Sequence, residues 1–334
     1  TVMDSSSGTD TAAVTVTVTT TNRGLIARWT MDAGDRSTTN VYDMLDLEMH
    51  GAISGDCAMV AGVLGDAIHL QGGFVDLGST LNLTNAMTAT MWVRPDVAQE
   101  DAGNRGLLAW AEDGAGWSYQ LRFGSPAANR LGFQCRHATS GSTWVTAGQS
   151  LDTGVWYHVA VQYDATSLAI FVNGQEKDRQ SFPGLGGSVA RTFIGQDGWD
   201  NRFLGAVDDV RIYDHALSST EILAMVTDTD GDGVPDDGDR DDDNDGMSDE
   251  DEAVAGTDPL DRYSLFVIGY SLTDGLSFGS VSGRLYDVLF KTNLMDAGDW
   301  LILTSDWEGT GAEMTFEDIS TDPQKFYRVK VQRP

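Results

Sequence analysis

The sequence predicts an all-β protein in which two β-domains are joined by an acidic linker. Short apolar runs separated by Gly, Asn and Asp turns recur through most of the chain, as in antiparallel sheets. A chain of 334 residues is long enough for about two domains and a connector. Between Asp228 and Asp261 sixteen residues are acidic and only Arg240 is basic, so half of the net charge of −30 lies in a tenth of the chain.

Composition excludes several classes of protein. The net charge argues against a nucleic-acid partner, which needs clustered Lys and Arg. Hydrophobic residues make up 41% of the sequence, and no apolar run approaches the roughly 18 residues of a membrane span.

The chain begins at Thr1, so we read it as a mature or excised fragment. Cys57 and Cys135 either form one disulfide or remain two buried thiols.

Residues 1–22 predict one strand. Turn formers come first, and Ala13–Thr19 then alternates β-branched residues with period two. A lone strand is not stable, so this one must pair with other strands. It resembles the closing strand of an upstream immunoglobulin- or cadherin-like domain. The alternative is a first strand of the next domain.

Residues 23–226 predict an antiparallel sandwich followed by one short helix. Ser218 and Glu221 are spaced as a capping box before Ile222, Leu223 and Met225. The predicted strands include Met87–Val93, Leu107–Trp110, Ser118–Phe123, Leu131–Cys135, Trp156–Tyr163, Leu168–Val172 and Val207–Tyr213.

Five segments of this region, in order, carry a family resemblance: GLIARWTMD (24–32), TATMWVRP (88–95), GVWYHVAVQY (154–163), IFVNG (170–174) and GAVDDVRIYDHAL (205–217). They resemble the laminin-G-like jelly-roll family, whose fold is the concanavalin-like β-sandwich. The resemblance implies core positions for Trp29, Trp92 and Trp156. It also implies calcium near Asp208 and Asp209, and near Asp43, although the family's Gly/Asn-rich turn is missing after Asp43.

Residues 262–334 predict a small C-terminal β-sandwich. Its strands are expected at Leu265–Ile268, Arg284–Phe290, Trp300–Leu303, Met314–Phe316 and Phe326–Val331. The order of these segments resembles a β-module that ends large exported bacterial proteins.

Two loops within residues 227–261 have the ligand spacing of a calcium site. Oxygen donors occupy positions 1, 3, 5, 9 and 12, Gly occupies position 6, and position 7 supplies a backbone carbonyl. The first loop comprises Asp228, Asp230, Asp232, Val234, Asp236 and Asp239, and the second comprises Asp241, Asp243, Asp245, Met247, Asp249 and Glu252. The loops resemble thrombospondin type 3 repeats, which implies two or more Ca²⁺ ions and a stiff joint. The alternative is a disordered acidic linker.

Catalytic motifs are absent from the sequence. The five histidines, including His158, have no zinc-site spacing, and neither HExxH nor a Gly-x-Ser-x-Gly elbow occurs. The Glu-x-Asp-x-Glu strand of glycosidases with this fold is also missing. We therefore expect no enzymatic activity.

Sugar binding requires aromatic planes with polar groups beside them. The tryptophans in segments where the family varies are Trp110, Trp117, Trp144 and Trp199, and Trp199 lies in the turn-rich loop GQDGWDNR (195–202). Arg122, Arg136 and His137 on mid-domain strands would suit an anionic glycan; the alternative is that they are solvated surface residues. We take Trp110, Trp117, Trp199, Arg122, Arg136 and His137 as candidate ligand contacts.

These observations favour a calcium-binding, carbohydrate-binding or adhesion segment of a large secreted or cell-surface bacterial protein. Its partner would be a polysaccharide, with neighbouring domains or subunits of a larger assembly. The alternative is a structural surface or filament protein whose jelly roll contacts other proteins.

Overall fold

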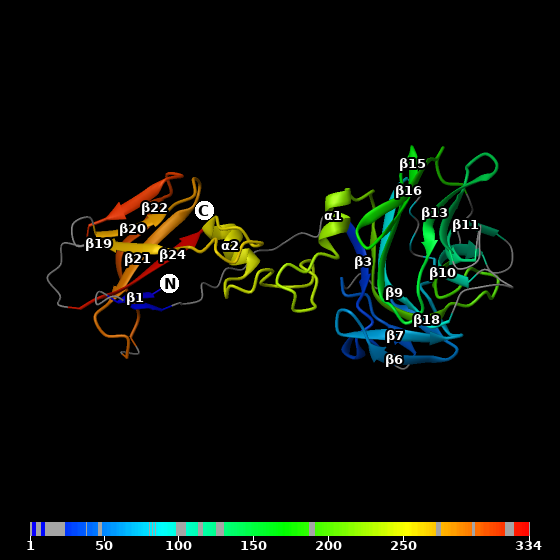
Figure 1. The fold of residues 1–334 in the computed structure, drawn as a ribbon, viewed down its shortest axis with the longest axis horizontal. Helices are drawn as coiled ribbons and strands as arrows, with labels where there is room; N and C mark the ends of the chain where they lie inside the picture. Colours follow the sequence, from blue (N-terminus) through cyan, green and yellow to red (C-terminus); the bar gives the residue numbers. More distant parts are fainter. Residues whose placement is uncertain are drawn as a thin grey trace. The chain divides into compact units, whose positions relative to one another are not determined.

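The computed structural model describes residues 2–4, 8–10, 24–37, 39–45, 49–79, 81, 83, 85–97, 105–112, 116–124, 130–186, 191–271, 275–295, 298–317 and 324–333. The chain divides into two compact units (Figure 1). The larger unit contains Thr21–Thr227 and Gly233–Gly238, and the smaller contains Thr1–Thr20, Asp228–Asp232 and Asp239–Pro334. The strand predicted at Ala13–Thr19 lies outside the described residues.

The larger unit is a sandwich of two antiparallel sheets around one hydrophobic core. We call one the pocket sheet, with strand order β13-β12-β11-β10-β17-β8-β5-β4. Its strands are β4 (Asn40–Val41), β5 (Gly51–Ser54), β8 (Phe74–Asp76), β10 (Arg105–Glu112), β11 (Gly116–Phe123), β12 (Arg130–Arg136), β13 (Ser142–Ser150) and β17 (Arg191–Ile194).

We call the other the helix sheet, with strand order β16-β15-β14-β9-β18-β7-β6 and β3 paired to β18. Its strands are β3 (Leu25–Trp29), β6 (Cys57–Ala61), β7 (Asp66–Gln71), β9 (Met87–Pro95), β14 (Tyr157–Tyr163), β15 (Ser167–Val172), β16 (Gln175–Ser181) and β18 (Leu204–Tyr213). This two-layer arrangement confirms the predicted jelly-roll class.

Alternation along β11 and β12 decides which side chains leave the core of the pocket sheet. Tyr119, Leu121 and Phe123 point into the core, so Gln120 and Arg122 between them point outward. In β12 the core residues are Leu131, Phe133 and Cys135, which leaves Gly132, Gln134 and Arg136 on the same outer face. Cys135 and Cys57 are both free thiols.

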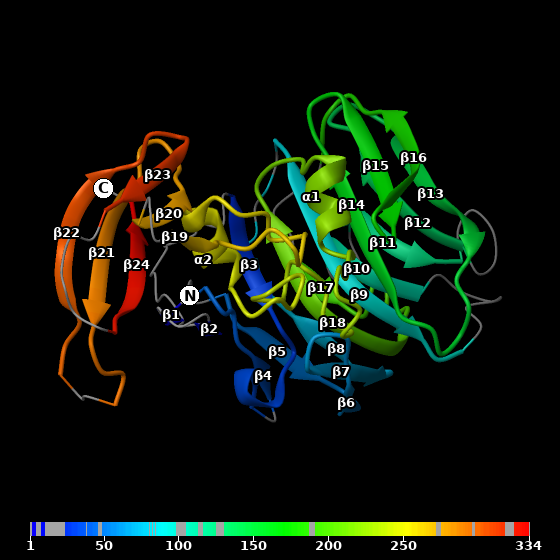
Figure 2. The ribbon, with the colours of Figure 1, turned by 60° about the vertical axis from the view of Figure 1, so that its left-hand side comes forward.

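The outer face of the helix sheet is covered by α1 (Ser219–Ala224) (Figure 2). The predicted capping box is confirmed, since the Ser218 hydroxyl accepts from the Glu221 N–H and the Glu221 carboxylate accepts from the Ser218 N–H. Ile222 packs with Ala160 and Phe171 of the sheet in a second apolar cluster. A short 3₁₀ helix, η1 (Ala33–Asp35), follows β3.

The smaller unit is a second β-sandwich with its own core. One sheet has the order β2-β1-β24-β21-β22 and the other β19-β20-β23 (Figure 2). Val2–Asp4 pairs with the last strand, so the chain's first described residues belong to this unit. The strands are β1 (Val2–Asp4), β2 (Gly8–Asp10), β19 (Ile268–Ser271), β20 (Gly275–Gly279), β21 (Leu285–Lys291), β22 (Leu301–Glu308), β23 (Glu313–Phe316) and β24 (Phe326–Gln332).

Two details of the smaller unit differ from the sequence prediction. The strand expected at Leu265–Ile268 begins only at Ile268, because Leu265 and Val267 are exposed and do not reach the core. A helix, α2 (Asp249–Ala255), lies within the acidic linker and buries Glu252 and Val254. Among the described residues no helix combines the length and apolarity needed to cross a membrane.

Candidate functional site

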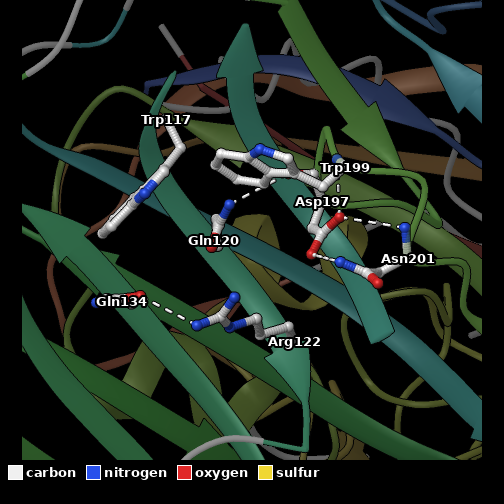
Figure 3. Close-up of a pocket in the computed structure, with 7 residues that line it drawn as sticks. All are labelled: Trp117, Gln120, Arg122, Gln134, Asp197, Trp199 and Asn201. Atoms are coloured by element: carbon white, nitrogen blue, oxygen red, sulfur yellow. Dashed lines mark hydrogen bonds between the residues drawn. The ribbon is translucent and has the colours of Figure 1, made fainter. Parts of the chain in front are cut away.

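A pocket of about 350 Å³ opens on the outer face of the pocket sheet (Figure 3). Its walls come from β11, from β12 and from the loop between β17 and β18. The lining residues are Trp117, Gln120, Arg122, Gln134, Asp197, Trp199 and Asn201. Three of the predicted ligand contacts, Trp117, Arg122 and Trp199, therefore lie together.

Asp197 shapes the loop that carries Trp199. It is completely buried, and its Oδ1 accepts hydrogen bonds from the backbone N–H groups of Trp199 at 3.0 Å and Asn201 at 3.3 Å. Its Oδ2 accepts from the Asn201 side-chain amide at 2.7 Å. Gly198 and Asp200 take positive φ angles of 85° and 64°, which turn the chain sharply on both sides of Trp199. The indole is thus presented to solvent, 40% exposed, from a fixed loop.

The same loop is anchored to the sheet beneath it. The N–H of Gly106 donates to the Asn201 carbonyl at 3.1 Å, and the Gln120 amide donates to the Asp197 carbonyl at 3.2 Å. A Cβ at Gly106 would lie 2.2 Å from the Asp197 backbone nitrogen, so only glycine allows this approach. No pattern in the sequence indicates this requirement.

Arg122 and Gln134 form the other end of the pocket, joined by a hydrogen bond of 3.4 Å from Arg122 Nη2 to Gln134 Oε1 (Figure 3). The Gln134 amide in turn donates to Ser142 at 2.7 Å. The Arg122 guanidinium carbon lies 4.8 Å from the centre of the Trp144 ring. Burial lowers the pKa of Arg122, and the negative charge of Asp197 opposes that shift.

This set of groups suits a polar ligand with apolar faces. Trp117 and Trp199 offer aromatic surfaces, while Gln120, Gln134 and Arg122 offer hydrogen-bonding groups at the sheet surface. Among the described residues that line the pocket, Asp197 is the only carboxylate, and its oxygens bind the loop. Its described lining residues therefore do not include the two flanking carboxylates used in glycoside hydrolysis.

The other predicted ligand contacts lie elsewhere. Trp110 is a correction: it is 3% exposed and packs in the core, its ring 5.8 Å from that of Tyr119, because strand β10 directs it inward. Arg136 is exposed at the end of β12 on the pocket face, but it does not line the pocket. His137 bonds locally, to the Ser140 carbonyl at 2.9 Å and the Thr143 hydroxyl at 2.8 Å.

The second acidic loop has the geometry of a calcium site. Asp241, Asp243 and Asp245 bring carboxylate oxygens within 4.8 Å of one another. Gly246 takes a φ of 95°, as the turn at position 6 requires. Glu252, at position 12, is carried by α2 and is fully buried.

Carboxylate oxygens without hydrogen-bond partners in this loop form a donor set that suits a cation. Both carboxylate oxygens of Glu252, Oδ2 of Asp243 and Oδ2 of Asp245 are buried without a hydrogen-bond partner among the described residues. Burial raises the pKa of Glu252 to about 7, against the effect of the nearby Thr257 hydroxyl, and the charges of Asp243, Asp245 and Asp249 add to the rise. Buried carboxylates without donors are costly unless a cation neutralises them, so the donor set fits Ca²⁺. Met247 and Asp249 stay predicted ligands.

The first acidic loop gathers its first three carboxylates, Asp228, Asp230 and Asp232, within 4.8 Å of one another. Gly233 takes a φ of 100° at position 6. Val234, Asp236 and Asp239 stay predicted ligands for this loop.

The three carboxylates of the larger unit predicted near calcium have different environments. Asp209 is a correction, because its oxygens bind Arg28 and Arg211, each at 2.7 Å, in a buried ion-pair cluster. Asp43 Oδ1 accepts from the N–H groups of Arg28 and Leu45, which gives it a structural role. A β-bulge between Asp208 and Arg211 interrupts the alternation of β18.

Asp208 keeps the features of a cation ligand. Its Oδ2 accepts from the N–H groups of Val63 at 2.8 Å and Leu64 at 3.0 Å. Its Oδ1 is buried and has no partner within the described part of the chain. Burial raises its pKa to about 7, against the hydrogen bonds of Leu64 and Val63, and the charges of Asp209 and Asp32 add to the rise. Asp32 was not among the predicted site residues, yet it lies near enough to Asp208 for its charge to raise the pKa of that carboxyl.

Sequence reasoning also missed Gln120, Gln134, Asp197 and Asn201 as pocket residues. Asp197 and Asn201 lie in the turn-rich segment that pointed to Trp199, so their residue types were a usable signal. The two glutamines lie on strands, where only the register shows that they meet: Gln120 pairs with Gln134 across β11 and β12.

Comparison with known proteins agrees with this fold. A family model for the concanavalin A-like lectin/glucanases superfamily matches residues 71–223, and one for the bacterial TSP3 repeat matches residues 241–262. Human (Homo sapiens) usherin is 37% identical over 79 residues, which cover 21% of this chain and 2% of usherin. The chain thus spans a very small part of that relative.

Two solved structures share the fold. Domain 4 of AbnA, an extracellular GH43 arabinanase from Geobacillus stearothermophilus, matches with a TM-score of 0.51 at 23% identity, over 61% of this chain and 98% of that one. The binding domain of Paraclostridial Mosquitocidal Protein 1 matches with a TM-score of 0.52 at 12% identity, over 89% of this chain and 72% of that one. In agreement with the sandwich and the ligand loop described above, residues 71–223 match the concanavalin A-like lectin/glucanases superfamily and residues 241–262 match the bacterial TSP3 repeat.

Proposed function

We propose that this chain is a saccharide-binding segment that holds sugar rings in the pocket beside Trp117 and Trp199. The observation that carries the proposal is the pairing of these partly exposed indoles with amide and guanidinium groups in one pocket. Sugars present apolar ring faces and many hydroxyls, which match these two kinds of group. The loop is already fixed by Asp197, so little conformational entropy is lost on binding.

Calcium has a structural role in this proposal. The two acidic loops would each hold one ion, and Asp208 is a ligand for a further ion in the larger unit. Bound Ca²⁺ supplies positive charge that neutralises crowded carboxylates. Sites of this type are served by the millimolar calcium outside cells, so we place the protein in the extracellular space or on the cell surface.

The shared fold supports a binding role rather than catalysis. The arabinanase domain of the same fold is described in complex with arabinotriose, so this sandwich can accommodate a saccharide. The pocket described above has no second carboxylate among its described lining residues, which favours binding without bond cleavage.

A glycan array tests the proposal with three proteins: the parent chain, Trp199→Ala and Trp156→Ala. Trp156 is a matched control, because it lies outside the pocket and, contrary to the expected core position, is partly exposed. We expect the parent and Trp156→Ala to retain the same glycan. The affinity of Trp199→Ala for that glycan should be lower by about tenfold or more. Equal retention by all three proteins, release of cleaved sugar, or self-assembly without glycan retention would contradict the proposal.

A further inference from the structure

We propose that Arg122 determines the specificity of the pocket and selects a sugar that carries a carboxylate, that is, a uronic acid. This inference rests on the proposed saccharide function of the same pocket. The tryptophans account for the binding of sugar rings in general, whereas Arg122 would decide which sugars bind best.

The guanidinium of Arg122 has unused hydrogen-bond donors. Arginine has five N–H donors. Within the described residues it makes one hydrogen bond, the 3.4 Å contact with Gln134, and Nε is buried without a partner. A partly buried cation with unpaired donors costs free energy, which acceptor oxygens of a ligand would recover.

The nearby Asp197 does not satisfy this cation. Its carboxylate is fully buried and is occupied by the N–H groups of Trp199 and Asn201 and by the Asn201 side chain. No ion pair joins Arg122 to any carboxylate in the described part of the chain. Arg122 therefore remains the charged group with free donors among the residues that line the pocket.

The sheet register holds this guanidinium in place. Arg122 pairs with Gly132 on β12, so no side chain stands directly beside it on that strand. Trp144 pairs with Gln134 from the next strand, and its ring lies 4.8 Å from the Arg122 guanidinium carbon. Trp144 is thus a positioning residue: stacking on its face and the Gln134 contact restrict the orientation of the planar fork.

The chemistry of that fork favours a carboxylate. Guanidinium binds a planar carboxylate through two parallel N–H···O bonds, which a hydroxyl group cannot form. In a pocket partly shielded from water this charge-assisted pair is stronger than an exposed one. A lysine would supply the charge without the bidentate geometry.

The test uses matched pairs of polysaccharides in affinity electrophoresis. Polygalacturonate, alginate and hyaluronan are each compared with their carboxyl-reduced products, in which the uronates have become neutral hexoses. The proteins are the parent chain, Arg122→Gln, Arg122→Lys and Arg136→Gln, all checked for folding by thermal unfolding. Arg136 is the matched control because it lies on the same sheet face outside the pocket.

We expect the parent and Arg136→Gln to bind at least one acidic polymer tenfold or more tightly than its reduced product. Arg122→Gln should lose that difference while it retains the reduced product, and Arg122→Lys should recover only part of it. Equal binding of acidic and reduced polymers by the parent chain would overturn the inference and leave the proposed function intact. Preference for chondroitin sulfate over hyaluronan would overturn the choice of a carboxylate, and retention of no polymer would overturn both proposals.

Discussion

The carboxylate of Asp197 accepts a hydrogen bond from the backbone N–H of Trp199 at 3.0 Å, so a fully buried charge holds an exposed indole at the rim of the pocket. Two further hydrogen bonds from Asn201 to the same carboxylate close the loop. Buried carboxylates are stable only when donors surround them, and here the loop itself supplies the donors. The position of Trp199 is thus set by the loop rather than by a ligand.

Replacing Asp197 with alanine should therefore weaken ligand binding indirectly, through the loop that holds Trp199. Asp197→Ala removes three acceptor contacts and frees Trp199, so we expect affinity for the array-selected glycan to fall by tenfold or more. The unfolding free energy should fall by about 2–3 kcal/mol, since three partly buried N–H groups lose their partner. Calorimetric titration and denaturant unfolding measure both effects. Unchanged affinity would show that Trp199 does not contact the sugar.

Calcium should stabilise the smaller unit through the second acidic loop. Asp243→Asn keeps the side-chain shape but removes one charge from the oxygen cluster. In the parent chain, calcium at a hundred times its dissociation constant should add about 2.7 kcal/mol to the unfolding free energy, and EDTA should remove it. The variant should lose most of this calcium-dependent gain in thermal unfolding. Asp299→Asn, an exposed residue outside the loops, should behave like the parent.

Substitution of Asp208 tests whether the larger unit binds an ion of its own. Asp208→Asn retains an acceptor for the Val63 and Leu64 N–H groups but removes the charge that a cation would need. We expect the calcium stoichiometry, measured by equilibrium dialysis, to fall by one ion per chain. An unchanged stoichiometry would mean that Asp208 is only a buried cap of this turn.

The burial of His158 should make the unfolding free energy of the larger unit depend on pH. Burial lowers the pKa of this imidazole to about 3; the Arg211 charge adds to the shift and the Asp209 charge opposes it. The unfolded chain binds a proton near pH 6.5 while the folded chain does not, so stability falls as pH decreases through this interval. The slope reaches about 1.4 kcal/mol per pH unit between roughly pH 6 and 3.

His158→Phe should remove that part of the slope, because phenylalanine keeps a ring against Trp92 and cannot titrate. Denaturant unfolding of both proteins between pH 4 and 7 measures the difference. Identical slopes would show that burial does not lower the pKa of this imidazole.

The acidic loops show how much a local sequence can specify. All ligands of one loop come from twelve consecutive residues, so the spacing of Asp243, Gly246 and Glu252 predicts the site without knowledge of the rest of the fold. The capping box of Ser218 and Glu221 is specified in the same way, by two residues one helical turn apart. Short apolar runs bounded by turn residues likewise predict strands such as β9 and β18.

The pocket, by contrast, depends on which strands become neighbours. Trp110 and Trp117 are both tryptophans in segments where the family varies, yet the first lies in the core and the second at the pocket. Periodicity alone does not give the phase of a strand when nearly all of its residues are buried, as in β10. Asp209 likewise binds Arg28, which is 181 residues away along the chain.

By itself the sequence determined the β-sandwich class, the two acidic loops and the turn-rich segment around Trp199. Only the tertiary structure decided that Arg122 reaches across Gly132 to Trp144, and that Asp197 holds Trp199 over the same sheet. The reason is physical: ligand loops and caps are closed by neighbours in sequence. A pocket on a sheet is closed by register, which long-range pairing and core packing fix together.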